Sequence, residues 1–232
     1  MGSERIVALN DVSLEIYKGE IACFLGTSGS GKSTFLNMVA GLEKPTRGEI
    51  IIGGVPLHKL DEAGVTLFRQ KNIGFIFQAY NLMPMLTALE NVSLPLLFRN
   101  VEKRKRDQIA RQAIELVGLK GYEKRRPTQM SGGQQQRVGI ARALAGRPKI
   151  IFADEPTGNL DTNTTKEVMN IIVNMVRENV QTLILVTHDR SIAEYADKIV
   201  TVRDGNIVDV IVKRGDVPPS GEAQPGGEAQ TH

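Results

Sequence analysis

A short glycine-rich segment, GTSGSGKST at residues 26–34, constrains this chain more than any other feature. It follows the apolar run IACFL at residues 21–25, which predicts a buried strand. It leads into residues 32–39, which predict a helix that stops near Gly41. This strand, loop and helix context favours a phosphate-binding loop over the alternative, a glycine-rich turn with a surface lysine. We call residues 26–34 the phosphate-binding loop.

The residue types in this loop suit a phosphate group and a divalent cation. Glycines let successive backbone N–H groups point at a phosphate, and the helix start adds its partial positive charge. Lys32 supplies a point charge for β- and γ-phosphate oxygens, and Ser33 offers a hydroxyl to Mg²⁺. The predicted binding residues are Gly26, Thr27, Ser28, Gly29, Ser30, Gly31, Lys32, Ser33 and Thr34.

Two acidic residues at the end of another apolar run, IIFADEPT at residues 150–157, supply the partner that such a loop needs. Asp154 is placed to hold the water shell of Mg²⁺, and Glu155 can accept a proton from an attacking water. Strand-end carboxylates can also form a simple turn or helix cap. Their occurrence after a phosphate-binding loop favours the catalytic interpretation.

Short apolar strands alternate with helical patterns, which predicts an α/β fold with a parallel-cored sheet. The early strands lie close together, so we expect an antiparallel side sheet that begins at residues 12–16 and turns at Lys18 and Gly19. In residues 105–117, an apolar stripe is expected from Ile109, Ala113, Leu116 and Val117. The other predicted strands cover residues 21–25, 49–53, 73–78, 149–154, 182–188, 198–205 and 206–212.

Composition places the 232-residue chain among globular proteins, as one large domain or as two lobes that share a core. With 41% hydrophobic and 24% charged residues and no long apolar run, we expect a soluble protein on the cytoplasmic side. The single cysteine, Cys23, excludes a disulfide framework and predicts a buried, inert thiol. A net charge of +3 is too mild to indicate nucleic-acid binding.

Five motifs in one order resemble the nucleotide-binding subunit of an ABC transporter. They are GTSGSGKS, the glutamine Gln78 that ends IGFIFQ, MSGGQ at residues 130–134, IIFADEPT followed by GNLD, and His188 within LVTHD. The resemblance covers residues 6–212. It implies a P-loop NTPase fold, the ABC ATPase cassette, with a parallel-cored sheet, an antiparallel β side sheet and an α-helical signature subdomain at about residues 79–147. The implied ATPase domain spans residues 1–214. Residues 215–232, rich in Gly and Pro, are expected to be a disordered tail.

In that family two copies enclose two ATP molecules, and the signature loop of each copy covers the γ-phosphate bound by the other. Ser131 and the N–H groups of Gly132 and Gly133 would therefore contact the partner's nucleotide, which explains a second anion-binding loop without a lysine. Asp161 would reach across the interface. Outside the phosphate-binding loop, the implied ATP-binding residues are Gln78, Ser131, Gly132, Gly133, Gln134, Asp161 and His188.

The resemblance also implies roles in hydrolysis. Gln78 would bind Mg²⁺ and the attacking water, and His188 would orient that water, although a polar cap at a strand end is the alternative for this histidine. His58 is expected to be merely exposed. Tyr17 lies too late in the chain to stack on adenine, so either a shortened N-terminus or a weaker contact to the base is expected. The implied catalytic residues are Glu155, His188 and Gln78, and the Mg²⁺ ligands are Ser33, Gln78 and Asp154.

Residues 77–96, FQAYNLMPMLTALENVSLPL, resemble the group of macrolide exporters, lipoprotein-release machines and related cell-division subunits. The implied partners are a second copy and a permease that docks near residues 78–86, at the cytoplasmic face of the membrane. Met83 and Met85 fit a permease socket, but core positions in the helical lobe are an equal alternative. Residues 99–111 carry a net charge of +4 and are expected to be a solvated helix face rather than a lipid-binding one.

The implied function is ATP-driven export or extraction of a hydrophobic or amphipathic substrate, such as a drug, peptide or lipoprotein. A regulatory subunit that activates a cell-wall hydrolase through a membrane partner would carry the same cassette and stays an alternative. A soluble ABC ATPase that acts on DNA or the ribosome would need a coiled-coil insertion or two cassettes in one chain. This sequence has neither, so no nucleic-acid partner is expected.

Overall fold

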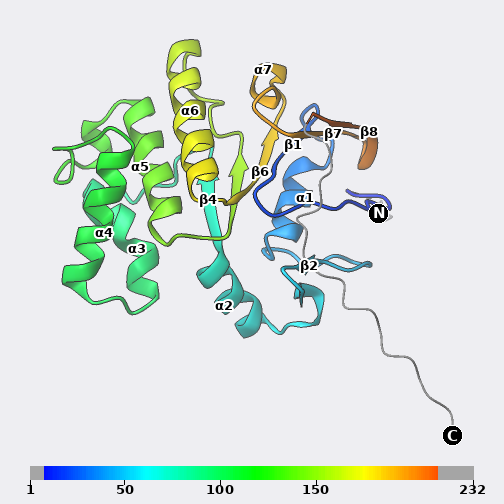
Figure 1. Ribbon diagram of the computed structural model, residues 1–232, viewed down its shortest axis with the longest axis horizontal. Coiled ribbons are helices and arrows are strands. Elements are labelled where there is room, and N and C mark those ends of the chain that lie inside the picture. The colour runs from blue at the N-terminus through cyan, green and yellow to red at the C-terminus, as the bar shows by residue number, and fades with distance from the viewer. Residues whose placement is uncertain (1–7, 214–232) are drawn as a thin grey trace, which may run out of the picture.

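The computed structural model describes residues 8–213 (Figure 1), and the predicted disordered tail at residues 215–232 lies outside them. The elements are β1 (Ile21–Leu25), α1 (Lys32–Val39), β2 (Ile51–Ile52), β3 (Val55–Pro56), η1 (Leu57–Lys59), α2 (Glu62–Asn72), β4 (Ile73–Phe77), α3 (Ala88–Phe98), α4 (Lys103–Leu116), η2 (Pro127–Gln129), α5 (Gly132–Ala145), β5 (Ile150–Asp154), α6 (Thr162–Glu178), β6 (Thr182–Thr187), α7 (Arg190–Ala193), β7 (Lys198–Arg203) and β8 (Asn206–Val212). The predicted helix at residues 32–39 and the predicted strand at residues 21–25 are confirmed.

A six-stranded sheet in the order β4-β5-β6-β1-β7-β8 forms the centre of the molecule. Its first five strands are parallel, and β8 pairs antiparallel with β7, so the expected parallel-cored α/β sheet is confirmed. Because parallel strands end at the same edge, the segments that follow β1, β4, β5 and β6 come together there. The motif residues lie in or beside those four segments, except for MSGGQ, which lies at the start of α5.

Helices cover both faces of this sheet, which explains why its strands are apolar throughout. On one face, Phe24 of β1 packs with Phe35 and Leu36 of α1. On the other face, Ile21 and Cys23 join a core shared with α5, α6 and α7. Burial raises the pKa of the Cys23 thiol to about 12, so the thiol stays protonated and inert at neutral pH, as predicted.

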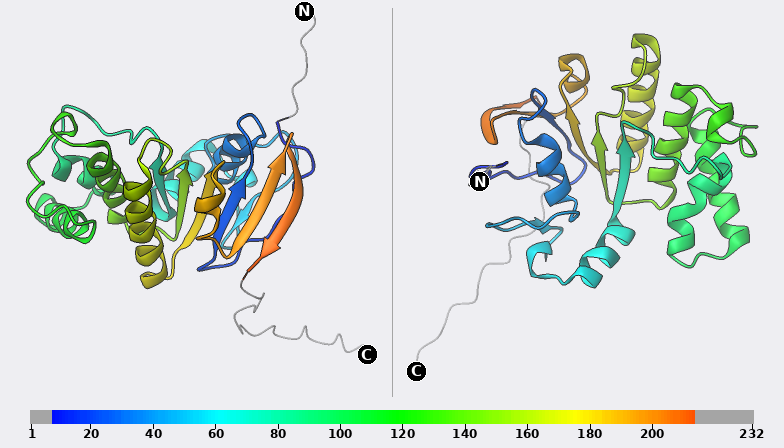
Figure 2. Two further views of the ribbon diagram at one scale, coloured as in Figure 1. Left: turned by 90° about the horizontal axis from the view of Figure 1, so that it is seen from above. Right: turned by 180° about the vertical axis from the view of Figure 1, so that it is seen from behind.

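Three helices, α3, α4 and α5, pack together as a lobe at one end of the sheet (Figure 1), opposite the end that carries β8 (Figure 2). Capping boxes fix two of their starting points, with Thr87 and Glu90 at α3 and Ser131 and Gln134 at α5. Within residues 8–213, no helix is long and apolar enough to cross a bilayer. We call α3, α4 and α5 the helical lobe.

The predicted strand at residues 12–16 is wrong, because this segment forms no strand ladder. Its side chains do alternate between half-buried and exposed. However, the Glu15 carbonyl oxygen accepts a hydrogen bond from the Lys198 side chain (Nζ) at 3.0 Å, and not from the backbone of a neighbouring strand. The turn at Lys18 and Gly19 is present. The small antiparallel sheet therefore consists of the two-stranded β2–β3 hairpin.

Three smaller expectations are also wrong. Leu116 is 65% exposed, because the buried stripe of α4 runs through Ala110, Ala113 and Ile114, and a residue two positions after Ile114 does not share its face of the helix. The strand predicted to reach residue 205 ends at Arg203, since Asp204 and Gly205 make the hairpin turn to β8. His58 is largely buried, and its Nδ1 accepts a hydrogen bond from the Ile50 N–H group at 3.3 Å.

Candidate functional site

The phosphate-binding loop connects β1 to α1 at the carboxyl edge of the sheet. Lys32 is only 6% exposed, and its Nζ donates to the Thr27 carbonyl oxygen at 2.7 Å and lies 3.5 Å from Ser30 Oγ. Gly31 precedes α1, and no side chain caps this helix. The first N–H groups of α1 have no intrahelical acceptor, so they are available to an anion.

Close packing explains why this loop needs glycine. Gly31 has φ 98°, and a Cβ there would lie 2.4 Å from the Ala8 carbonyl oxygen. A Cβ at Gly26 would lie 2.4 Å from the Val202 carbonyl oxygen. Backbone atoms cannot yield as a flexible side chain can, so a larger residue at either position would distort the loop.

The β7–β8 turn supports the loop from outside, and the sequence did not reveal this. The Gly205 N–H group donates to the Ser30 carbonyl oxygen at 3.0 Å, and Ala8, Asp204 and Gly205 line the same cleft as the loop. The Asp-Gly dipeptide indicates a hairpin turn. Nothing local in the sequence indicates which distant segment that turn contacts.

Glu155 follows β5 in a strained backbone conformation. Its φ of 46° is left-handed, which costs a non-glycine residue about 1–2 kcal/mol. Its Oε1 lies 2.8 Å from His188 Nδ1, and its Oε2 accepts from the Thr187 hydroxyl at 3.3 Å. Such strain persists where neighbouring contacts impose it. Here these contacts point the carboxylate toward the end of β6.

The charges of the site act on one another through a partly buried environment. Burial raises the pKa of Asp154, and the Glu155 carboxylate raises it further, while Lys32 opposes the change. Burial lowers the pKa of Lys32, and the same two carboxylates oppose that change. Two carboxylates beside one lysine leave an excess of negative charge, which fits a divalent cation with oxygen ligands.

Most of the predicted site residues meet in one cleft. Gly26, Thr27 and Ser30 belong to the same loop but do not line the cleft. The Gln78 carbonyl oxygen accepts from Asn159 Nδ2 at 3.0 Å, which ties Gln78 to the segment after Glu155. The residues that line the cleft are Ala8, Ser28, Gly29, Gly31, Lys32, Ser33, Thr34, Gln78, Asp154, Glu155, His188, Asp204 and Gly205.

The signature residues are not part of this cleft. Ser131 is exposed, and its Oγ accepts from the Gln134 N–H group at 3.3 Å, while Gln134 Oε1 accepts from the Ser131 N–H group at 3.1 Å. Asp161 caps α6, and its hydrogen bonds with Thr164 lower its pKa. The residues that do not line the cleft are Ser131, Gly132, Gly133, Gln134 and Asp161. Within one chain, Ser131, Gln134 and Asp161 act as helix caps.

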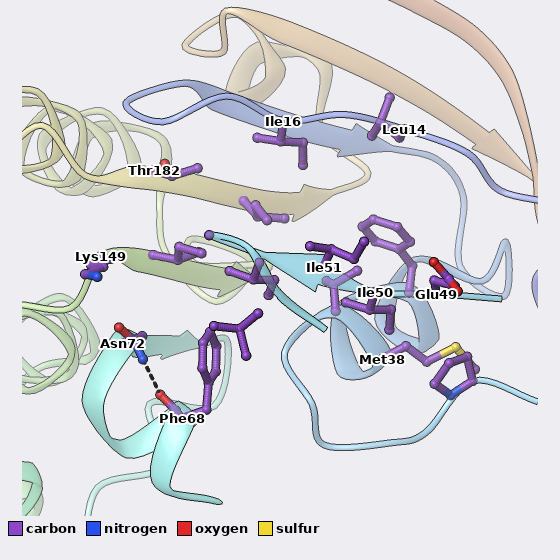
Figure 3. Close-up of a pocket in the computed structure, with 18 of the residues that line it drawn as sticks. Leu14, Ile16, Met38, Glu49, Ile50, Ile51, Phe68, Asn72, Lys149 and Thr182 are labelled. Carbon is purple, nitrogen blue, oxygen red and sulfur yellow. Dashed lines mark hydrogen bonds between the residues drawn. The ribbon is translucent and has the colours of Figure 1, made fainter. Parts of the chain in front are cut away.

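A second, wider hollow lies between the β2–β3 hairpin, residues 12–16, α1 and α2 (Figure 3). Apolar side chains such as Leu14, Ile16 and Phe68 line much of it. It contains neither the phosphate-binding loop nor the strand-end carboxylates, so its greater size does not make it the reactive site. Tyr17 lines this hollow rather than the cleft.

Two exposed methionines lie just after Gln78. Met83 is 55% exposed and Met85 is 81% exposed, whereas Leu82 and Leu86 are half-buried. The alternative that both methionines belong to the core of the helical lobe is therefore wrong. Large exposed apolar side chains in a group are typical of an interaction surface.

Comparisons with known proteins agree with the motifs. The family model described as "ABC transporter" matches residues 9–158. The "Uncharacterized ABC transporter ATP-binding protein MJ0796" of Methanocaldococcus jannaschii is 44% identical over 211 residues, which is 89% of this chain and 90% of that protein. The "Macrolide export ATP-binding/permease protein MacB" of Salmonella choleraesuis is 44% identical over 207 residues, 89% of this chain but 32% of that protein.

The solved structures include a close match to the whole described fold. The "Dimeric structure of a post-hydrolysis state of the ATP-binding cassette MJ0796 bound to ADP and Pi" has a TM-score of 0.85 and 42% identity, and covers 93% of this chain and 94% of that chain. The "Dimeric Structure of MJ0796, a Bacterial ABC Transporter Cassette" has a TM-score of 0.86 and 43% identity.

Proposed function

Because the chain belongs to the ABC transporter family, as an ATP-binding ATPase cassette, we propose that two copies close around two ATP molecules and that hydrolysis reopens them. One observation carries this proposal. The signature loop, residues 131–134, lies outside the cleft of the phosphate-binding loop, and its Ser131 is exposed. A site that uses both elements needs a second copy. The dimers solved for a relative with 42% identity support the same arrangement.

Within one copy, the phosphate-binding loop and Lys32 hold the β- and γ-phosphates of ATP, and Glu155 accepts a proton from the attacking water. Thr187 and His188 hold the Glu155 carboxylate in place, and Gln78 orients the water. Ser33, Gln78 and Asp154 line the same cleft and offer oxygen donors that would hold Mg²⁺, which would neutralise phosphate charge during the transfer.

The second copy completes the pocket from the γ-phosphate side. Ser131, with the N–H groups of Gly132 and Gly133, donates to that phosphate at the start of α5, where the helix dipole also favours an anion. Gln134 and Asp161 of this second copy also contact the nucleotide. Because these donors are uncharged, the closed dimer is held by hydrogen bonds that are lost when the phosphate leaves. A lysine in this loop would slow the reopening.

We place the cassette at the cytoplasmic face of a membrane, bound to a permease at residues 78–86. The exposed Met83 and Met85 support this docking site, because flexible apolar side chains suit a groove that receives a helix. The proposed cassette spans residues 1–214, with its helical subdomain at about residues 79–147. Identity with an export ATP-binding/permease protein supports export of a hydrophobic or amphipathic substrate.

Mixing two inactive variants tests the shared pocket. Lys32→Ala disables the phosphate-binding loop and Ser131→Arg disables the signature loop, so each variant alone should be inactive. A mixed dimer contains one intact pocket, so random mixing should restore about a quarter of the wild-type ATPase rate. A mixture that stays inactive, or a single variant that keeps full activity, would refute the two-copy pocket.

Cysteine cross-linking in native membranes tests the permease. A Met85→Cys variant should cross-link to a cytoplasmic segment of a permease, whereas a Val180→Cys variant, exposed elsewhere on the cassette, should not. Identification of what the permease's extracytoplasmic domain binds then separates export from hydrolase activation. Absence of any membrane partner for the Met85→Cys variant would contradict the docking site.

A further inference from the structure

The segment after Gln78 has an unusual backbone. Tyr80 has φ 58° and Asn81 has φ 47°, so two successive residues that are not glycine lie in the left-handed region. This conformation is unfavourable for residues with a side chain and persists where neighbouring groups impose it. A neighbouring group that holds both Tyr80 and Asn81 in this conformation is expected to contact the backbone of each.

Arg142 of α5 makes that contact. Its Nη2 donates to the Tyr80 carbonyl oxygen at 2.9 Å, and its Nη1 donates to the Asn81 carbonyl oxygen. Among residues 8–213, no carboxylate forms an ion pair with Arg142. The guanidinium therefore uses its planar fork on two backbone acceptors, a geometry that lysine cannot reproduce.

Tyr80 also touches the beginning of the same helix. A Cβ at Gly132 would lie 2.8 Å from the Tyr80 hydroxyl oxygen, so the end of this ring lies against the residue that follows Ser131. A Cβ at Gly139 would lie 3.7 Å from the Tyr80 carbonyl oxygen. Tyr80, two positions after Gln78, therefore contacts α5 both at the signature loop and at Arg142.

We propose that Arg142 is a positioning residue for ATP hydrolysis, which holds Gln78 and the signature loop in a fixed relation so that they move together when a second copy engages. This inference rests on the proposed function. Arg142 does not line the cleft and acts only through Tyr80 and Asn81. A change at Arg142 therefore misplaces Gln78 without removing any group that holds the nucleotide.

Kinetics of purified variants test this role. Arg142→Gln should lower kcat about tenfold while KM and the affinity for ATP stay within about twofold, because positioning acts on the reaction step rather than on ground-state binding. Arg142→Lys should restore part of the loss, since one ammonium can reach either carbonyl but cannot span both. Equal losses in kcat and in ATP affinity would overturn the proposal.

Arg99 provides a matched control within the same lobe. Its guanidinium donates to the carbonyl oxygens of Gln70, Gly146 and Lys71 at 2.7, 2.6 and 3.1 Å, and none of these acceptors belongs to the segment after Gln78. Arg99→Gln should lower thermal stability and leave kcat unchanged. If both arginine variants lose kcat in proportion to their stability, Arg142 is only structural, and the proposal fails.

Hydrogen exchange of the nucleotide-free protein separates this inference from the proposed function. The amides of residues 80–83 should exchange faster in Arg142→Gln, or in Arg142→Lys if the first variant does not fold, but not in Arg99→Gln. Unchanged exchange would overturn the inference even if the wild type hydrolyses ATP. A wild type without ATPase activity would instead refute the proposed function, and the exchange rates would still decide whether Arg142 holds this segment.

Discussion

The two anion-binding elements of this chain differ in how they are stabilised. The phosphate-binding loop is packed between Ala8, Val202 and Gly205, and it encloses a lysine that is 6% exposed. In the signature loop, Ser131 is exposed, and it satisfies its hydrogen bonds by capping its own helix. An element that is complete in one copy can be rigid. An element that a second copy completes has to be stable when that copy is absent, and capping provides that stability.

Replacing Glu155, the proposed proton acceptor, should have the largest effect. Glu155→Gln keeps the size of the side chain but cannot accept a proton, so kcat should fall about a thousandfold. ATP binding should survive, because both anion-binding elements are intact, and the variant should elute as a dimer from a sizing column with ATP and Mg²⁺. A monomer at saturating ATP and Mg²⁺ would contradict a pocket formed by the phosphate-binding loop of one copy and the signature loop of the other.

A large residue in the signature loop should distinguish the roles of the two anion-binding elements. Ser131→Arg should lower kcat about a hundredfold, because it blocks the donors that stabilise charge on the γ-phosphate. Nucleotide binding to a single copy should remain, since the phosphate-binding loop is untouched.

A second capping box in the chain gives the matched control for Ser131. Thr87 caps α3 with the same pair of hydrogen bonds, so Ser131→Ala and Thr87→Ala should destabilise the fold to a similar degree, by about 1 kcal/mol each. Only Ser131→Ala should also reduce ATPase activity. Similar ATPase rates in the two variants would show that Ser131 is a cap and nothing more.

Removal of the Gln78 side chain should have a smaller effect. Gln78→Ala should lower kcat about tenfold and weaken the dependence on Mg²⁺, because water and metal are held less well while the carboxylates stay in place. Steady-state ATPase at several Mg²⁺ concentrations measures both effects. An unaltered Mg²⁺ dependence would show that Gln78 is not a ligand of Mg²⁺.

The same contrast explains what the sequence can reveal. The loop at residues 26–34, its helix and the strand before it follow from local chemistry, and the structure confirms the bounds of both elements. The strand expected at residues 12–16 fails, because alternating side chains determine which face is buried but not whether a neighbouring strand is there to pair. Burial is a local signal, whereas pairing is a long-range one.

Support from distant segments is the other part that local patterns miss. Gly205 donates to the phosphate-binding loop from a hairpin 175 positions later than Ser30, and Arg142 donates to Tyr80 across 62 positions. A dipeptide or a lone arginine carries no information on its distant contact. The residues proposed to touch the phosphates form recognisable sequence motifs, whereas the distant residues that contact those segments are identified only by the fold.

The smallest expected effect concerns Asp161, which caps α6 in one copy and is proposed to act in the other. Asp161→Ala should lower the melting temperature by about 2–4 °C through loss of the cap, whereas Asp161→Asn should keep the cap and lose only the charge. Hydrogen bonds with Thr164 lower the pKa of Asp161 from 3.8, so the charge stabilises the fold fully above that value and less as the pH falls through the lower, folded-state value. Melting curves of wild type and Asp161→Asn should therefore differ by a constant amount near neutral pH and converge below pH 3.8. A difference that persists in acid would mean that the charge does not stabilise the cap.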